Sequence, residues 1–319
     1  MTLDISSYGE LGLRLSPTDN ASLARADELS VNIIGTEFNV LSNMACLGWK
    51  AALLSAVPDS PMGEKARSAV RENGVNDELI HVSAEDDRLG IYFVDYGKDP
   101  KPTSVYFDRK RTAFTRWEPV ESEIEKVLDT RLLHLSGLTL ALSETAAETA
   151  MLLMTKAKAK GVPVSFDLNY RGKLWDSQSA AKVCLPFIEQ ADILIAPRSD
   201  VNELFGETGN AKASLVCLQD ISTAEIIAVT DGDRGAVAMI GGELITELAA
   251  PVQIVDRLGA GDGFAAGFLH AINSGQEDVA LKSGVQMAAL ALAQKGEQVA
   301  IDRKIFNQIV AGNAGRLQR

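Results

Sequence analysis

The sequence predicts an α/β fold in which helices cover both faces of a mostly parallel central sheet, with a small β-sheet added to it. Beyond residue 121, near-continuously apolar strands alternate with helical segments, which is typical of a parallel sheet buried on both faces. Residues 88–116 instead hold two alternating segments around a Gly-Lys-Asp-Pro-Lys-Pro turn, which predicts a hairpin. We expect one domain over residues 1–319, with a β lid built from segments near 11–17, 29–34 and 89–109.

In the first part of the chain, short apolar runs predict strands and apolar residues at helical spacing predict helices. Strands are expected at residues 3–8, where the run is too short for a helix, at 29–34, where apolar and polar residues alternate, and at 51–57. A helix is expected over 37–47 and another over 63–73, and Gly74 then supplies a C-terminal signal for the second.

The remaining chain reads as repeated strand and helix units, which place polar residues where strands end. The predicted strands cover residues 131–135, 163–167, 192–197, 226–230, 236–240 and a segment near 252–255, and the predicted helices cover 143–160, 178–189, 200–206 and 260–272. Ligands of such sheets bind at the carboxyl ends of the strands. Candidate functional residues are therefore expected at those ends.

Composition limits the classes of partner. The net charge of −12 argues against a nucleic-acid or acidic-membrane partner, because phosphate polymers would be repelled. The three cysteines are far apart and form no Cys-x-x-Cys pair, so structural zinc is not expected. Their number and spacing instead fit a protein of a reducing compartment. The first residues lack the basic and apolar regions of a signal peptide, and no run reaches transmembrane length. We expect a cytoplasmic protein.

The stretch Asp-Arg-Leu-Gly-Ala-Gly-Asp-Gly-Phe-Ala-Ala-Gly-Phe at 256–268 is the strongest functional signal. A turn of Gly259, Ala260 and Gly261 before a helix exposes backbone N–H groups to which an anion can come close, so it predicts a phosphate site. The helix dipole should help Asp262 to ionise, and an ionised carboxylate there can accept the proton of an attacking hydroxyl. The alternative is an ordinary tight loop with an acidic helix start.

The whole string Asp-x-x-Gly-Ala-Gly-Asp-x-Phe-x-x-Gly resembles the C-terminal signature of the ribokinase-like (PfkB) carbohydrate kinases. The family usually has Thr after the first Asp, and Arg257 here is similar to the variant found in its 2-keto-3-deoxygluconate kinases. This resemblance implies a ribokinase-like fold, ATP and Mg²⁺ as cofactors, and Asp262 as catalytic base. It also implies a lid that covers the sugar and pairs two chains into a homodimer or a higher homo-oligomer.

Two further strings resemble the family's sugar site. Residues 35–40 are similar to its N-terminal sugar-binding string, which places Gly35 and Asn39 at the substrate, although residue type alone favours Asn39 on a helix surface. In the hairpin, the resemblance assigns substrate contacts to Tyr92, Phe107 and Arg109. Phe107 stands where the family commonly has Tyr, which removes a hydroxyl. From residue types alone, an amphipathic strand packed on the body is the favoured interpretation for Tyr106.

Two loops resemble the family's nucleotide side. The string Asp-Leu-Asn-Tyr-Arg-Gly-Lys-Leu-Trp at 167–175 places Asn169 near the nucleotide phosphates and Arg171 at the sugar acid, while on chemistry alone Asp167 and Arg171 could merely pair across a turn. The Thr-Asp-Gly-Asp-Arg-Gly string at 230–235 resembles the ATP loop, which assigns nucleotide contacts to its first, third and last residues, namely Thr230, Gly232 and Gly235.

One departure concerns magnesium. The family usually carries Asn-x-x-Glu after the strand at 192–197, and this chain has Pro197, Arg198, Ser199 and Asp200. The Asn is lost, and only Asp200 remains as a candidate metal ligand. Magnesium can still be held by substrate phosphates, water and one carboxylate.

Together these motifs predict an enzyme that uses ATP to phosphorylate the 6-hydroxyl of 2-keto-3-deoxygluconate, giving 2-keto-3-deoxy-6-phosphogluconate. The expected partners are a small sugar acid and ATP, held by Arg171 and Arg109 and by the Gly-Ala-Gly turn. The alternatives are a kinase for a neutral ketose of the fructose or tagatose type and a non-catalytic relative that binds sugar or nucleotide.

Overall fold

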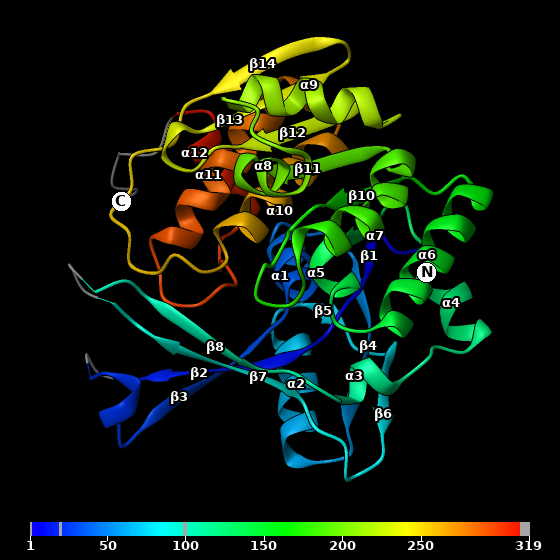
Figure 1. Ribbon diagram of the computed structural model, residues 1–319, viewed down its shortest axis with the longest axis vertical. Coiled ribbons are helices and arrows are strands. Elements are labelled where there is room, and N and C mark those ends of the chain that lie inside the picture. Colours follow the sequence, from blue (N-terminus) through cyan, green and yellow to red (C-terminus); the bar gives the residue numbers. More distant parts are fainter. Residues whose placement is uncertain (1, 19–20, 98–100, 313–319) are drawn as a thin grey trace.

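The computed structural model describes residues 2–18, 21–97 and 101–312, and these form two sheets with helices around the larger one (Figure 1). The larger sheet has the strand order β14-β13-β12-β11-β10-β9-β1-β4-β5, and β6 pairs with β4. Its strands are β1 (Ile5–Tyr8), β4 (Ala51–Pro58), β5 (Val75–Asn76), β6 (Ile80–Ser83), β9 (Leu133–Ser136), β10 (Val164–Asp167), β11 (Ile193–Pro197), β12 (Ile226–Thr230), β13 (Ala236–Ile240) and β14 (Glu243–Glu247).

Pairing in this sheet is parallel from β5 to β12 and antiparallel from β12 through β13 to β14. The parallel strands are buried because both of their faces are covered, as their continuous apolar runs predict. Since they run in one direction, the ends of β10 and β12 lie at the same edge, and Asp167 and Thr230 end these two strands.

Two apolar cores lie on opposite faces of the large sheet, and neighbouring residues of β4 show the alternation. Leu53 packs into the core formed with α1, α2, α10 and α11, whereas Leu54 packs into the core formed with α3, α4, α6, α7 and α9. The helices are α1 (Thr36–Cys46), α2 (Pro61–Glu72), α3 (Ala113–Arg116), α4 (Glu121–Val127), α5 (Gly137–Leu140), α6 (Glu144–Lys160), α7 (Ser177–Gln190), α8 (Arg198–Phe205), α9 (Ala211–Ile221), α10 (Ala260–Asn273), α11 (Ala280–Leu292) and α12 (Arg303–Val310).

The second sheet has the order β3-β2-β7-β8 and extends to the lower left in Figure 1, below α10 and α11. Its strands are β2 (Gly12–Pro17), β3 (Leu29–Ile34), β7 (Gly90–Asp95) and β8 (Ser104–Asp108). They come from the segments in which the sequence predicts strands, and β7 and β8 form the predicted antiparallel pair. Within the described part of the chain, no helix combines the length and the apolarity needed to cross a bilayer.

One predicted strand is wrong. Residues 252–255 form no strand, and Ile254 and Val255 are 44% and 50% exposed. The backbone N–H of Val255 donates to the carbonyl of Leu292 at the end of α11 (2.8 Å), so this segment packs on a helix and has no partner strand. The last strand of the sheet is β14 instead. The apolar pattern of the sequence does not indicate this strand, because it has an acid at each end and forms the edge of the sheet.

Candidate active site

The Gly-Ala-Gly turn begins α10, as predicted. Gly259 precedes the helix with φ of +83°, and a Cβ on it would lie 2.8 Å from the Cα of Glu297, so this position requires glycine. A Cβ on Gly261 would meet no atom within 4 Å. The first N–H groups of a helix have no partner within the helix. Open space beside such groups fits an anion and accords with a phosphate site here.

Asp262 lies in the first turn of α10 and is only 6% exposed. Burial raises the pKa of its carboxyl to about 8, and the negative charges of Glu297 and Asp167 add to this rise. A hydrogen bond from Asn39 and the positive charge of Arg171 act in the opposite direction on this pKa. The expectation that the helix dipole makes this acid ionise easily is therefore wrong for the protein alone, because desolvation outweighs the dipole.

Asn39 is buried, not on a helix surface as its residue type alone would favour. Its Nδ2 donates to Asp262 Oδ2 (2.6 Å) and to Glu297 Oε2 (2.7 Å), while its Oδ1 accepts from Gln298 Nε2 (2.6 Å). Gly35 comes just before α1, and a Cβ there would collide with the carbonyl oxygen of Glu10. Asn39 thus joins α1 to the start of α10.

The loop after β10 carries the other predicted polar residues. Asn169 has a φ of +36°, is 5% exposed, and its Oδ1 has no hydrogen-bond partner among the described residues. Burial, and then the charge of Asp200, raise the pKa of Asp167 to about 7. Arg171 is exposed, and its charge lowers the pKa values of Asp167 and Asp262.

The side chains around Asn169 offer carboxylate and amide oxygens, the type of ligand that a hard cation such as Mg²⁺ binds. Asp200 lies at the start of α8, accepts from the N–H of Tyr170 (2.8 Å) and from Ser199 Oγ (2.9 Å), and has a pKa raised by burial. Carboxylate and amide oxygens are ligands that Mg²⁺ prefers. In the part of the chain that the structure describes, no group of three or more His, Cys, Asp or Glu side chains is arranged to hold a metal ion.

The predicted sugar contacts of the hairpin lie together on the second sheet. The rings of Tyr92 and Phe107 meet edge to face with centroids 6.1 Å apart, and the Arg109 guanidinium carbon lies 5.9 Å from the Phe107 ring centroid. Arg109 is already paired, because its Nε and Nη2 donate to Glu10 Oε2 at 2.8 and 2.7 Å. Glu10 is buried and also accepts from Thr112.

The predicted ATP loop follows β12. Gly232 and Gly235 have positive φ values of +58° and +97°, and a Cβ on Gly232 would meet no atom within 4 Å. Asp231 accepts from Arg198 and Arg234 at 2.7 Å each, and their donation holds its pKa below the usual range.

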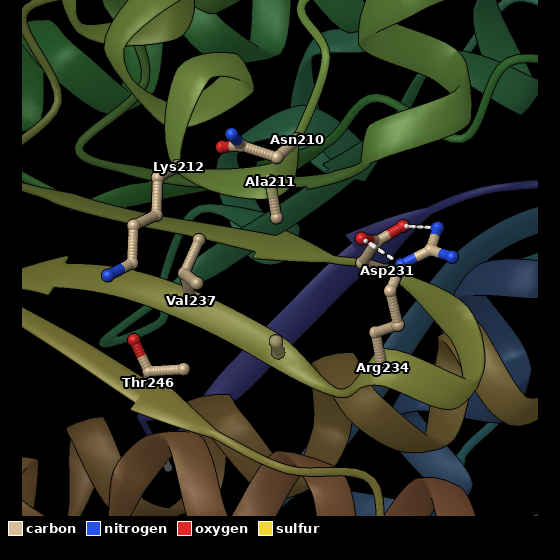
Figure 2. A pocket seen from close by; sticks show the side chains of 8 residues that line it. Asn210, Ala211, Lys212, Asp231, Arg234, Val237 and Thr246 are labelled. Atoms are coloured by element: carbon tan, nitrogen blue, oxygen red, sulfur yellow. Dashed lines mark hydrogen bonds and ion pairs between the residues drawn. The ribbon is translucent and has the colours of Figure 1, made fainter.

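A cavity of about 340 Å³ lies beside this loop (Figure 2). Figure 2 shows the Asp231–Arg234 pair at one side of it and Lys212 at the other. The residues that line it are Asn210, Ala211, Lys212, Asp231, Arg234, Ala236, Val237 and Thr246. Thr230, Gly232 and Gly235 do not line this cavity.

Sequence reasoning gave no role to several buried charges around the site. Glu37 accepts from Ser136 and Thr139 at 2.6 Å each, and burial raises its pKa. Glu10, Arg14, Asp256 and Glu297 are buried as well. Arg14 sits between Leu13 and Leu15 in an alternating strand, a pattern that normally indicates a side chain facing solvent. The signal that could have found the acids is an isolated charge within an apolar run, as in Tyr8-Gly9-Glu10-Leu11.

Comparisons with known proteins agree with this geometry. The family model of pfkB family carbohydrate kinases matches residues 2–304. The chain is 33% identical to 2-dehydro-3-deoxygalactonokinase from Haloferax volcanii over the full length of both, and 26% identical to 5-dehydro-2-deoxygluconokinase from Bacillus subtilis over 93% of this chain and 92% of the relative. The crystal structure of 2-dehydro-3-deoxygluconokinase from Thermotoga maritima matches with a TM-score of 0.89 and 27% identity, covering 97% of this chain and 100% of that one.

Proposed function

The chain belongs to the pfkB family of carbohydrate kinases and is an ATP-dependent sugar kinase with the ribokinase-like fold, and from this premise we propose that it phosphorylates a 2-keto-3-deoxy sugar acid. We infer 2-keto-3-deoxygluconate as the substrate and its 6-hydroxyl as the acceptor. The names of the relatives from Haloferax volcanii and Thermotoga maritima support a sugar acid of this class. Because the kinase uses ATP and the cytoplasm supplies it, we propose that the protein acts in the cytoplasm.

The observation that carries the substrate class is the guanidinium of Arg171. It is exposed, its charge acts on Asp262, and among the described residues no hydrogen bond or ion pair engages it. An unpaired guanidinium whose charge reaches the proposed base suits a carboxylate, which it can hold with two parallel hydrogen bonds. A neutral sugar would leave that cation without a partner.

Asp262 is proposed as the general base. It takes the proton of the 6-hydroxyl while that oxygen forms a bond to the γ-phosphorus of ATP and the bond from this phosphorus to the β–γ bridging oxygen breaks, releasing ADP. A pKa near 8 makes the carboxylate a stronger base, although roughly a tenth would be ionised at pH 7 in the protein alone. The N–H groups of Gly259, Ala260 and Gly261 would stabilise charge on the γ-phosphate.

The nucleotide side rests on the loops after β10 and β12. We propose that Asn169, Thr230, Gly232 and Gly235 contact ATP, since the buried Asn169 Oδ1 lacks a partner and the Gly232 backbone is open. Asp200 and Asn169 would hold Mg²⁺ together with the nucleotide phosphates. When bound, Mg²⁺ supplies neutralisation of charge that develops on the phosphates.

We propose that the second sheet is the lid of a single domain and covers the sugar with Tyr92 and Phe107, which would exclude water that could hydrolyse ATP. Lys173 Nζ donates to the carbonyl of Val105 (2.7 Å), so the loop that carries Arg171 already touches this sheet. Val31 and Tyr106 on the same sheet are 38% and 56% exposed. Such apolar exposure supports a homodimer or higher homo-oligomer formed through the lid.

A kinase for a neutral ketose is the second candidate, and the pairing of Arg109 with Glu10 is the observation that favours it. A cation that is already compensated cannot attract a substrate carboxylate strongly. The sugar-acid proposal therefore depends on Arg171, with Gly35, Asn39 and Arg109 shaping the pocket.

Replacing Arg171 with Met tests the substrate class. If Arg171 binds a carboxylate, kcat/KM for 2-keto-3-deoxygluconate should fall by about 30- to 150-fold, because a charge-assisted hydrogen-bonded contact contributes roughly 2–3 kcal/mol. Steady-state kinetics on 2-keto-3-deoxygluconate and on fructose measures this, and Lys182→Met, which removes an exposed cation on α7, is the matched control. An equal, small effect in the two variants would contradict carboxylate binding at Arg171.

A further inference from the structure

Arg14 connects three segments that are far apart in the chain. It lies on β2, its side chain is 2% exposed, and its Nη2 is 2.7 Å from Asp256 Oδ2 in the loop before α10. Its Nη1 is 3.1 Å from Glu297 Oε1 in the loop after α11, and Nη2 also donates to Tyr96 Oη (2.6 Å). A buried ion pair adds little net stability compared with well-packed apolar residues. Its contact with Glu297, which also accepts from Asn39, points to another role.

Glu297 links Arg14 to Asn39. It accepts from Arg14, from the hydroxyl of Tyr92 and from Asn39, which also donates to Asp262. We propose that Arg14 is a positioning residue for the phosphoryl transfer, acting on Asp262 through Glu297 and Asn39. This inference rests on the proposed function, in which Asp262 is the base.

The geometry gives the Asn39 amide one orientation. Its Oδ1 accepts from Gln298, so its Nδ2 must serve both Asp262 and Glu297. Glu297 stays in reach only while its other oxygen is held by Arg14 and Tyr92. Without Arg14, Glu297 can leave Asn39, and the amide that orients the base is then free to turn.

The charge of Arg14 matters as well as its position. The titratable groups whose charges act on Asp262 are Glu297 and Asp167, which raise its pKa, and Arg171, which lowers it. Burial alone would lower the pKa of Arg14, but the charges of Glu297 and Asp256 act in the opposite direction and the pKa is raised, so the guanidinium stays charged. Arg14 therefore compensates Glu297, whose charge acts on the base, as well as Asp256 in the loop before α10.

The test measures kcat and both KM values for Arg14→Met, Arg14→Lys, Glu297→Gln and the Arg14→Met/Glu297→Gln double variant of the full chain. We expect Arg14→Met to lower kcat by about tenfold or more with both KM values changed less than about threefold, since a small misplacement of a reacting group is costly. Lys should restore most of the rate. The double variant should be no slower than the slower single variant, because both changes break one chain of contacts.

The pH profile of kcat/KM gives a second readout that a purely structural role would not change. Glu297→Gln removes a charge that raises the pKa of Asp262, so the acid limb of this variant should move to lower pH. An unmoved limb in Glu297→Gln would overturn the inference, and this measurement needs no Arg14 variant. Additive losses in the double variant would overturn it as well. Arg67→Met on α2, whose partner is Asp77, is the control and should keep wild-type kinetics.

The same assay on Asp262→Asn separates the two proposals. If that variant keeps its turnover, Asp262 is not the base and the proposed function fails. If it is inactive while Arg14 and Glu297 act independently, only the positioning role of Arg14 fails.

Discussion

Asp262→Asn is expected to lower kcat by about 10²- to 10⁴-fold, the range by which a positioned general base accelerates a reaction. The amide is nearly the same size and can still accept the hydrogen bond from Asn39, so ATP and the sugar should bind as before. Steady-state rates of ADP release together with equilibrium ATP binding measure both effects. Wild-type kcat/KM should rise with pH up to about 8, as the carboxyl ionises.

Stability distinguishes loss of the base from loss of the fold. The folded protein raises the pKa of Asp262 above its ordinary value, so the folded state holds a proton that the unfolded chain releases between about pH 4 and pH 8. This contribution to stability is complete at low pH and is lost as pH rises through that window. Asp262→Asn should therefore be at least as stable as wild type at pH 8. A clear drop in its melting temperature there would contradict this account.

Arg109→Met is expected to lower the free energy of unfolding by about 3–5 kcal/mol, because it leaves the buried Glu10 carboxylate without its cation. Urea unfolding at neutral pH measures the change. Arg88→Met is the matched control, since Arg88 is an exposed partner of Asp108, and it should change stability by less than about 1 kcal/mol.

The double variant Glu10→Gln/Arg109→Met checks the cause. Removing both charges should recover much of the stability, because no uncompensated charge stays buried. If the double variant is as unstable as Arg109→Met alone, lost packing of the arginine side chain explains the effect and the charge does not. The activity of the double variant then reports what Arg109 contributes to substrate binding apart from stability.

Local patterns were sufficient to predict most of the fold. The buried strands β9 to β12 have apolar runs that fit only a covered parallel sheet, and the second sheet follows from alternating segments before residue 110. The segment at 252–255 was misread because an apolar run that crosses a helix looks like a strand until its hydrogen-bond partner is known.

The site was predictable where one short string carries the chemistry. The glycines at 259 and 261 and the acid at 262 are adjacent in sequence, and the structure places them at a helix start. The contacts of Arg14 could not be predicted, since its partners Asp256 and Glu297 lie more than two hundred residues along the chain. Burial was likewise invisible, and it reverses the expected pKa shift of Asp262.

The most direct test of the proposed activity is ADP release by the purified protein with ATP and Mg²⁺. The sugars to compare are 2-keto-3-deoxygluconate, its galactonate-derived epimer and fructose, with a control that contains no sugar. We predict turnover that depends on the sugar acid, with little release on fructose or without sugar, and the faster epimer then identifies the substrate. Rapid release on fructose with none on either sugar acid would contradict the assignment.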